Sequence, residues 1–103
     1  MNRKLRSELV DKLFDAILLL KTREECYSFF EDIGTVSEIK AFAQRLEVAK
    51  MLDRGNTYRE IHEKTGASEA TISRVSRALN YGTDGYRLIL ERLKEAERSE
   101  KAD

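Results

Sequence analysis

The stretch TYREIHEKTGASEATISRV, which covers Thr57–Val75, contains two short helical patterns separated by one glycine. Thr57 and Ser68 each precede a helical pattern, where a hydroxyl can accept a free amide hydrogen of the first turn. Gly66 lies between the patterns and tolerates the positive φ that a sharp turn between helices requires. The spacing therefore predicts a helix-turn-helix.

The two predicted helices have an apolar side and a polar side. Ile61, Ile72 and Val75 fall where the helices would pack together. Small and hydrogen-bonding side chains remain on the outside, as a helix that enters the major groove of DNA requires. These outer residues are Ser68, Glu69, Ala70, Thr71, Ser73, Arg74 and Arg77. We predict that the second helix binds DNA in a sequence-specific manner.

Glu69, the first residue after the cap of this helix, admits two interpretations. Its carboxylate repels phosphate but can accept a hydrogen bond from cytosine N4. It also complements the positive end of the helix dipole, which requires no ligand. The sequence leaves both interpretations open.

The rest of the chain is also predicted to be helical. Proline is absent from the 103 residues, and the apolar spacing is helical throughout. We expect an all-α fold of six helices and no strand, in a single domain over residues 1–103. Its parts are a helical dimerisation core (4–54, with helices near 4–21, 22–33 and 35–54), the helix-turn-helix (57–81), a C-terminal helix (83–98) and a disordered tail (99–103).

The first predicted helix is apolar over more than one face. One stripe contains Leu5, Leu9 and Leu13, and a second contains Phe14 and Leu18. An ordinary surface helix of a small domain has a single apolar stripe. Burial between two subunits would cover both stripes, so we expect a homodimer. The alternative is a loosely packed terminal helix with exposed leucines.

Composition excludes several classes of protein. No apolar run is long enough to span a membrane, and the N-terminus lacks the apolar stretch of a signal peptide. The single Cys26 cannot form an internal disulfide, so we expect a cytoplasmic protein. One cysteine and one histidine, His62, do not make a zinc site, and no catalytic set is recognisable. We therefore expect no enzyme activity, no metal and no membrane partner.

The charge distribution leaves an alternative function open. The chain has 19 basic and 19 acidic residues, so its formal net charge is zero. The segment 23–38 is acidic, whereas the predicted second helix of the motif is mildly basic. The acidic segment and the zero net charge fit a helix-turn-helix used for protein–protein interaction better than they fit one that binds DNA.

Four short motifs occur together in this chain: Gln44-Arg45-Leu46, Met51-Leu52-Asp53-Arg54-Gly55, Tyr58-Arg59-Glu60-Ile61 and Ala70-Thr71-Ile72-Ser73-Arg74. Together they resemble the Trp repressor family, and within it the bacterial branch of the YerC/YecD type. The resemblance extends from the first helix to about Lys94. It implies a repressor built as an intertwined homodimer, which presents two helix-turn-helices to successive major grooves of double-stranded DNA. Such a dimer reads a palindromic operator.

The resemblance also assigns DNA contacts residue by residue. It implies that Glu69, Ala70 and Thr71 approach base edges. The positions that it places near phosphates are Tyr58, Arg59, His62 and Ser73.

The co-repressor of the family is L-tryptophan, and the resemblance implies a pocket between two arginines, matched here by Arg45 and Arg74. The family has a glycine after the second arginine and a serine three residues further on. Here these positions are Val75 and Ala78. The added side-chain atoms of valine would occupy the space of the indole ring. We therefore expect a regulator that works without L-tryptophan as a cofactor.

Overall fold

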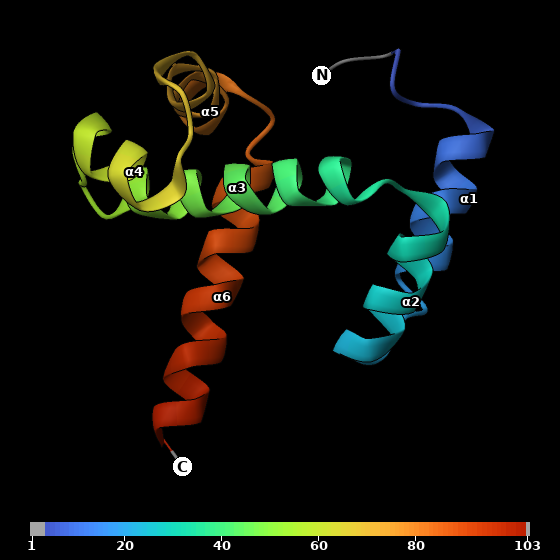
Figure 1. Cartoon of the computed structure of the whole chain (residues 1–103). Coiled ribbons are helices and arrows are strands. Elements are labelled where there is room, and N and C mark those ends of the chain that lie inside the picture. The colour runs from blue at the N-terminus through green and yellow to red at the C-terminus, as the bar shows by residue number, and fades with distance from the viewer. Residues whose placement is uncertain (1–3, 103) are drawn as a thin grey trace. The chain divides into compact units, whose positions relative to one another are not determined.

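The structure, a computed structural model, describes residues 4–102, without the side chain of Ala102. Residues 1–3 and 103 of the predicted domain lie outside the described residues. Within the described range the chain forms six helices and no strand, so the all-α prediction is confirmed (Figure 1). The helices are α1 (Glu8–Ile17), α2 (Arg23–Ile33), α3 (Val36–Asp53), α4 (Tyr58–Thr65), α5 (Glu69–Tyr81) and α6 (Gly85–Ala102).

The chain divides into two compact units, Met1–Lys40 and Ala41–Asp103, and the division falls within α3. The hydrophobic core lies in the second unit. It consists of Val48, Ala49, Met51, Ile61, Ala67, Ile72, Val75, Leu79 and Leu90. Between residues 4 and 40 no described residue is buried. The single domain over residues 1–103 stays a prediction, because the first unit has no buried core of its own within one chain.

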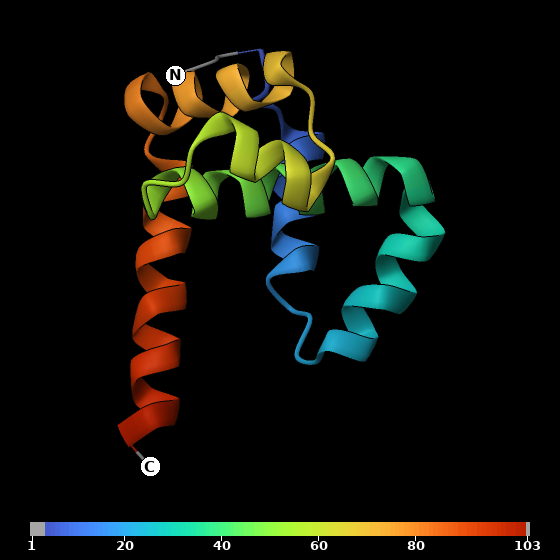
Figure 2. The same cartoon turned by 60° about the vertical axis from the view of Figure 1, so that its left-hand side comes forward.

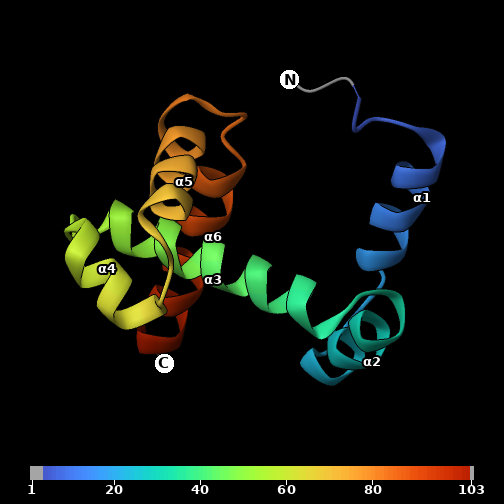
Figure 3. The same cartoon turned by 45° about the horizontal axis from the view of Figure 1, so that its top comes forward.

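In the second unit, α4, α5 and α6 gather about the C-terminal half of α3 (Figure 3). The second helix of the helix-turn-helix, α5, contacts both α4 and α6. Its buried residues Ile72, Val75 and Leu79 recur at helical spacing, so one face of α5 is fixed in the core. Asp53 at the end of α3 accepts a hydrogen bond from Lys94 Nζ of α6 at 2.9 Å. These contacts hold α5 and α6 on α3.

Hydroxyl groups cap the starts of α2, α3, α4 and α5, and those of α4 and α5 are the caps that the sequence predicts. Thr22, Thr57 and Ser68 each accept the amide hydrogen of the residue three positions on. Thr57 and Glu60 form a complete capping box. Thr35 begins α3 in the same way, through reciprocal bonds with Glu38 at 2.9 and 3.1 Å. Because the caps satisfy amides that have no partner inside the helix, they fix the first residue of each helix.

The first helix is shorter than the predicted 4–21, and that prediction is wrong at both ends (Figure 2, blue and cyan segments). Ser7 is the N-cap and has an extended backbone, so the helix begins at Glu8. At the other end, Leu20 N–H bonds the carbonyl of Ile17 in a tightened turn. Lys21 N–H then bonds the carboxylate of Glu25 in α2 at 2.8 Å. The cap of α2 therefore takes the backbone that would have prolonged α1.

The last helix is longer than predicted. The sequence predicts a helix over 83–98 and a disordered tail over 99–103, but α6 runs from Gly85 to Ala102. Asp84 has a left-handed φ of 67°, which delays the start. The charged end contains strong helix formers, and Arg98 pairs with Glu95 one turn earlier. The tail prediction is therefore wrong up to Ala102, and Asp103 lies outside the described residues.

Among residues 4–102, none of the helices combines the length and the apolar character that crossing a bilayer demands.

Candidate DNA interface

The turn between α4 and α5 has the geometry that its glycine predicts. Gly66 has a φ of 74° and ends α4, with its N–H bonded to the carbonyl of His62 at 2.8 Å. Thr65 braces the same turn, because its hydroxyl donates to the carbonyl of Ile61 and accepts from Ala67 N–H. A left-handed residue and a bonded threonine leave the turn little freedom.

Two side chains outside the turn fix it further. Gln44 of α3 donates from Nε2 to the carbonyl of Thr65 at 3.1 Å. His62 lies 2.8 Å through Nδ1 from the carbonyl oxygen of Ala67, which can only accept. Nδ1 therefore carries the hydrogen, and Nε2 of the exposed ring has no partner among the described residues. The angle between α4 and α5 is thus set before any ligand arrives.

The beginnings of α4 and α5 border one open depression of about 430 Å³. Five residues line it: Tyr58, Arg59, His62, Glu69 and Ile72. The structure thus brings together three positions that the resemblance places near phosphates and one that it places near base edges. A ring hydroxyl, a guanidinium and an imidazole suit a phosphate backbone.

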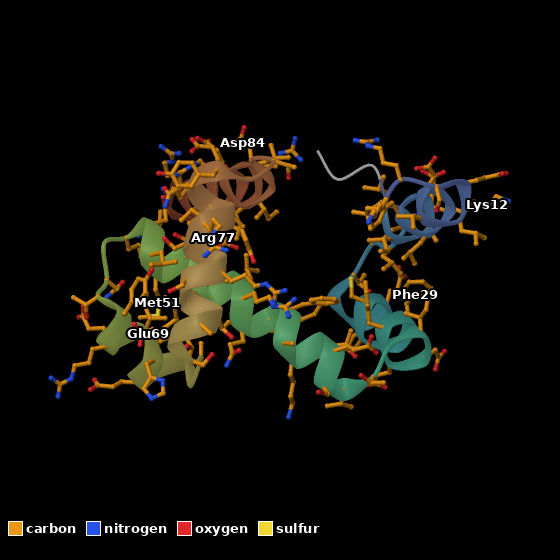
Figure 4. The ribbon with its side chains drawn as sticks, turned by 90° about the horizontal axis from the view of Figure 1, so that it is seen from above. Lys12, Phe29, Met51, Glu69, Arg77 and Asp84 are labelled. Carbon is orange, nitrogen blue, oxygen red and sulfur yellow. The ribbon has the colours of Figure 1, made fainter. Side chains whose placement is uncertain are left out.

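The outer face of α5 borders a second depression, of about 270 Å³. It is lined by Ala70, Thr71, Arg74 and Arg77, all four predicted as DNA contacts. Figure 4 shows Glu69 at the end of α5 that joins the turn and Arg77 farther along the helix. Both arginines are exposed and have no ion-pair partner among the described residues. Guanidiniums in this state are free to meet guanine or phosphate.

Two of the predicted DNA contacts, Ser68 and Ser73, line neither of these depressions. The Ser68 hydroxyl is the cap of α5 and accepts Thr71 N–H at 3.1 Å. Ser73 is half-buried, so it is less accessible than the arginine that follows it. These serines support the helix or lie at the margin of the exposed face.

Acidic residues on α4 are occupied within the protein. Hydrogen bonds from the backbone N–H and the hydroxyl of Thr57 lower the pKa of Glu60, and the Glu60 carboxylate accepts Thr57 N–H at 2.8 Å. Glu63 pairs with Arg59 at 3.3 Å. Both side chains of that pair are largely exposed, so a phosphate can replace Glu63 at little cost.

The four residues of the predicted tryptophan pocket have separate surroundings. Arg45 is half-buried, and its guanidinium carbon lies 5.8 Å from the ring centroid of Phe42. Arg74 lines the depression on α5, whereas Ala78 lines a different one with Leu46 and Tyr86. Val75 is 2% exposed and belongs to the core. Within the described residues, Val75 therefore packs as a core side chain.

Sequence reasoning missed the support that Gln44 and Thr65 give to the turn. Gln44 is polar on the side of α3 that carries Val48, four residues later in the core. A polar residue on an apolar stripe signals a buried hydrogen bond, but its partner is a backbone carbonyl that no sequence pattern identifies. No group of three or more metal-ligating side chains occurs within residues 4–102.

Comparison with known proteins agrees with this geometry. Residues 8–94 match the family described as Trp repressor protein. The chain is 60% identical to the "uncharacterized protein YerC" of Bacillus subtilis (strain 168), over 91% of this chain and 90% of that protein.

Two solved structures are similar over nearly their whole length. A crystal structure from Staphylococcus aureus, provisionally called a Trp repressor, has 55% identity and a TM-score of 0.88, and covers 91% of this chain and 95% of that one. A TrpR-like protein from Eubacterium eligens ATCC 27750 has 58% identity and a TM-score of 0.87, over 90% and 96%. The chain therefore belongs to the Trp repressor family, a family of helix-turn-helix DNA-binding regulators.

Proposed function

We propose that this protein is a transcriptional repressor that reads a palindromic operator as a homodimer and does so without L-tryptophan. It acts in the cytoplasm on double-stranded DNA and needs neither a metal nor another cofactor. The observation that carries the proposal is the outer face of α5, where Thr71, Arg74 and Arg77 stand exposed or half-exposed around one depression.

The rigid turn supports DNA reading by this face. Gly66, Thr65 and the bonds from Gln44 and His62 fix α5 on α4 in the free protein. A preordered recognition helix loses little conformational entropy on binding, so more of the contact energy remains as affinity. Phosphate contacts from the start of α4 would set the register, and α5 would meet base edges.

The exposed apolar surface of the first unit supports the homodimer. Leu9 and Leu18 are 79% and 80% exposed in the single chain, and Phe14 is 48% exposed. A monomeric protein rarely leaves so many large apolar side chains in water. A second copy would cover them, and its symmetry would match a palindromic operator.

The position of Val75 supports independence from L-tryptophan. Its side chain fills core space between α5 and the helices on which α5 packs. The recognition helix is thereby held in place by the protein's own side chain. A ligand at this position would have to displace a buried valine, which costs roughly 1–3 kcal/mol in a packed core.

Selection of bound sequences from a random pool of double-stranded DNA, with and without L-tryptophan, tests the proposal. A palindromic site enriched equally in both conditions is the expected result. Enrichment only with L-tryptophan would overturn the independence from the ligand. Absence of enrichment in both conditions would overturn DNA reading and favour a helix-turn-helix used for protein–protein interaction.

Arg74→Ala then tests the contact face on the enriched site. We expect a loss of about 1–3 kcal/mol in specific binding free energy, measured by titration of labelled DNA. Arg92→Ala is the matched control, since it removes the same charge from the exposed surface of α6. Equal losses in both variants would assign the effect to net charge rather than to α5.

A further inference from the structure

We propose that the Glu69 carboxylate accepts a hydrogen bond from the amino group of a cytosine in the major groove, and so determines the base at the tip of α5. This inference rests on the proposed function. It names the base chemistry that the first residue of the recognition helix selects.

The first turn of α5 contains one polar side chain that the protein itself does not use. The Ser68 hydroxyl accepts Thr71 N–H and donates to Thr71 Oγ1, each at 3.1 Å. Ala70 has no polar side-chain atom. Glu69 is exposed and forms no side-chain hydrogen bond or ion pair with any described residue. Its carboxylate oxygens are available to a ligand.

The acids of α4 differ from Glu69 in this respect. Glu60 accepts Thr57 N–H at 2.8 Å and completes a capping box. Glu63 lies 3.3 Å from the guanidinium of Arg59 on the same helix. Both have a partner within their own helix or its cap. Of the three acidic residues within the helix-turn-helix (57–81), Glu69 is the one without such a partner among the described residues.

The surroundings of Glu69 place it where DNA would lie. It borders the same depression as Tyr58, Arg59 and His62, whose side chains suit phosphate. A carboxylate has only acceptors, and so do phosphate oxygens, so Glu69 gains nothing from the backbone. In the presence of three phosphate-binding neighbours, its oxygens are left for a base edge.

The major groove offers an acceptor-only group few partners. Guanine presents the acceptors N7 and O6, and thymine presents O4 and a methyl group. Adenine places its N6 amino group beside the acceptor N7, which repels one carboxylate oxygen. Cytosine presents the N4 amino group as its donor. The chemistry of Glu69 therefore selects cytosine, at one position in each half-site.

The helix dipole of α5 would not by itself produce a preference for cytosine. A carboxylate at a helix N-terminus is stabilised whether or not DNA is present. That effect is equal for every base, so it predicts no base preference. The two roles of Glu69 therefore differ in a measurable quantity.

Sequence selection with the wild type, Glu69→Ala and Glu69→Gln measures this quantity. With the wild type we expect cytosine at a symmetric pair of positions, preferred by about 5-fold to 150-fold over other bases. Glu69→Ala should lose that preference and keep the others. Glu69→Gln should move it toward adenine, because an amide can pair with both N6 and N7. Glu91→Gln on α6 removes the same charge outside the helix-turn-helix and should change nothing.

The outcomes separate the inference from the proposed function. A wild-type palindrome with the same base frequencies in both Glu69 variants would overturn the inference and leave the proposed function intact. A uniform gain in affinity for all sequences would also overturn it, because it would show repulsion of phosphate alone. If the wild type selects no sequence, the proposed function fails and the inference fails with it.

Discussion

At the scale of single residues, Gly82 shows a requirement that differs from that of Gly66. Gly66 needs a left-handed φ, whereas the φ of Gly82 is −85° and open to any residue. A Cβ at Gly82 would lie 2.4 Å from the carbonyl oxygen of Ala78. The chain leaves α5 by passing close to its last turn, and only a residue without a side chain fits there.

Gly82→Ala should therefore lower the free energy of unfolding by roughly 1–3 kcal/mol, because the backbone must move to relieve the clash. Gly85→Ala is the matched control. Its Cβ would have Thr83 Oγ1 at 3.9 Å as its nearest neighbour, so this change should be neutral or stabilise by up to ~1 kcal/mol. Urea unfolding of both variants measures the difference. Equal effects would contradict the close approach.

Val75 gives a second prediction at this scale. Since the side chain is 2% exposed, Val75→Gly removes core contacts in addition to adding glycine's backbone entropy. We expect a loss of roughly 2–4 kcal/mol in unfolding free energy. Val75→Ala separates the two causes, because alanine leaves a cavity but favours the helix.

The same variants test what Val75 excludes. If its side chain fills the space of an indole, Val75→Gly or Val75→Ala should gain a heat of binding for L-tryptophan that the wild type lacks. Calorimetry at a temperature where the variants are folded measures it. A wild-type protein that binds L-tryptophan tightly would contradict the exclusion.

Single residues could be predicted from the sequence where their chemistry is local. Gly66, Thr57 and Ser68 were predictable because turn and cap chemistry is local. The bond from Gln44 to Thr65 and the approach at Gly82 were not, since each depends on backbone that lies distant or folds back in space. The predicted contacts on the outer face of α5 follow from helical periodicity, whereas those of Tyr58, Arg59 and His62 follow from the family resemblance. No sequence pattern predicts that Glu69 lacks a side-chain partner, because this depends on which neighbouring groups are already bonded.

At the scale of elements, the capping boxes make stability depend on pH. Hydrogen bonds from the backbone N–H and hydroxyl of Thr35 and of Thr57 lower the pKa of Glu38 and of Glu60, respectively, from that of an ordinary glutamate. A carboxyl with a lower pKa in the folded state contributes stability above its unfolded pKa. That contribution is lost as the pH falls through the folded pKa.

We therefore expect the wild type to lose more stability than the double variant Glu38→Gln, Glu60→Gln when the pH falls from ~6 to ~3. Urea midpoints at each pH measure this. Glu63→Gln serves as the control, since its partner is a side chain rather than a capped backbone amide. Parallel curves for wild type and double variant would show that the caps carry no proton-linked stability.

Local sequence signals predict the starts of the capped helices but not the ends of α1 and α6. The predicted hydroxyl caps of α4 and α5 begin their helices correctly, and α2 begins with the same kind of cap. The C-terminal ends of α1 and α6 were predicted wrongly, because no glycine or proline marks them. There, competition with the next cap shortens α1, and favourable helix formers prolong α6.

At the scale of the whole molecule, the two units differ in how they are stabilised. The second unit has nine buried core residues, whereas no described residue before Ala41 is buried. Burial of apolar surface is the main favourable term in folding, and in a single chain the apolar side chains of the first unit are at most half-buried, so they gain less from it. A second copy of the chain would supply it, which is why the wide apolar surface of α1 indicates assembly.

The proposed homodimer can be tested by its mass in solution. Light scattering at micromolar concentration should give twice the 11.9 kDa of one chain. The double variant Leu9→Glu, Leu18→Glu places charge in the surface that the partner would cover. Removing two leucines from the interface between the two copies costs roughly 3 kcal/mol or more. The dissociation constant of the dimer should therefore rise by at least about a hundredfold.

Lys12→Gln is the matched control, since Lys12 lies on the same helix but is exposed and paired with Glu8. It should leave the mass unchanged. Because the first unit has no buried core of its own, the dissociated double variant should also unfold at a lower urea concentration than the wild type. As a monomer it should bind a palindromic site no more tightly than a single half-site. A wild-type mass of one chain would mean that the leucines of α1 stay in water, and the symmetry argument for a palindromic operator would fall with it.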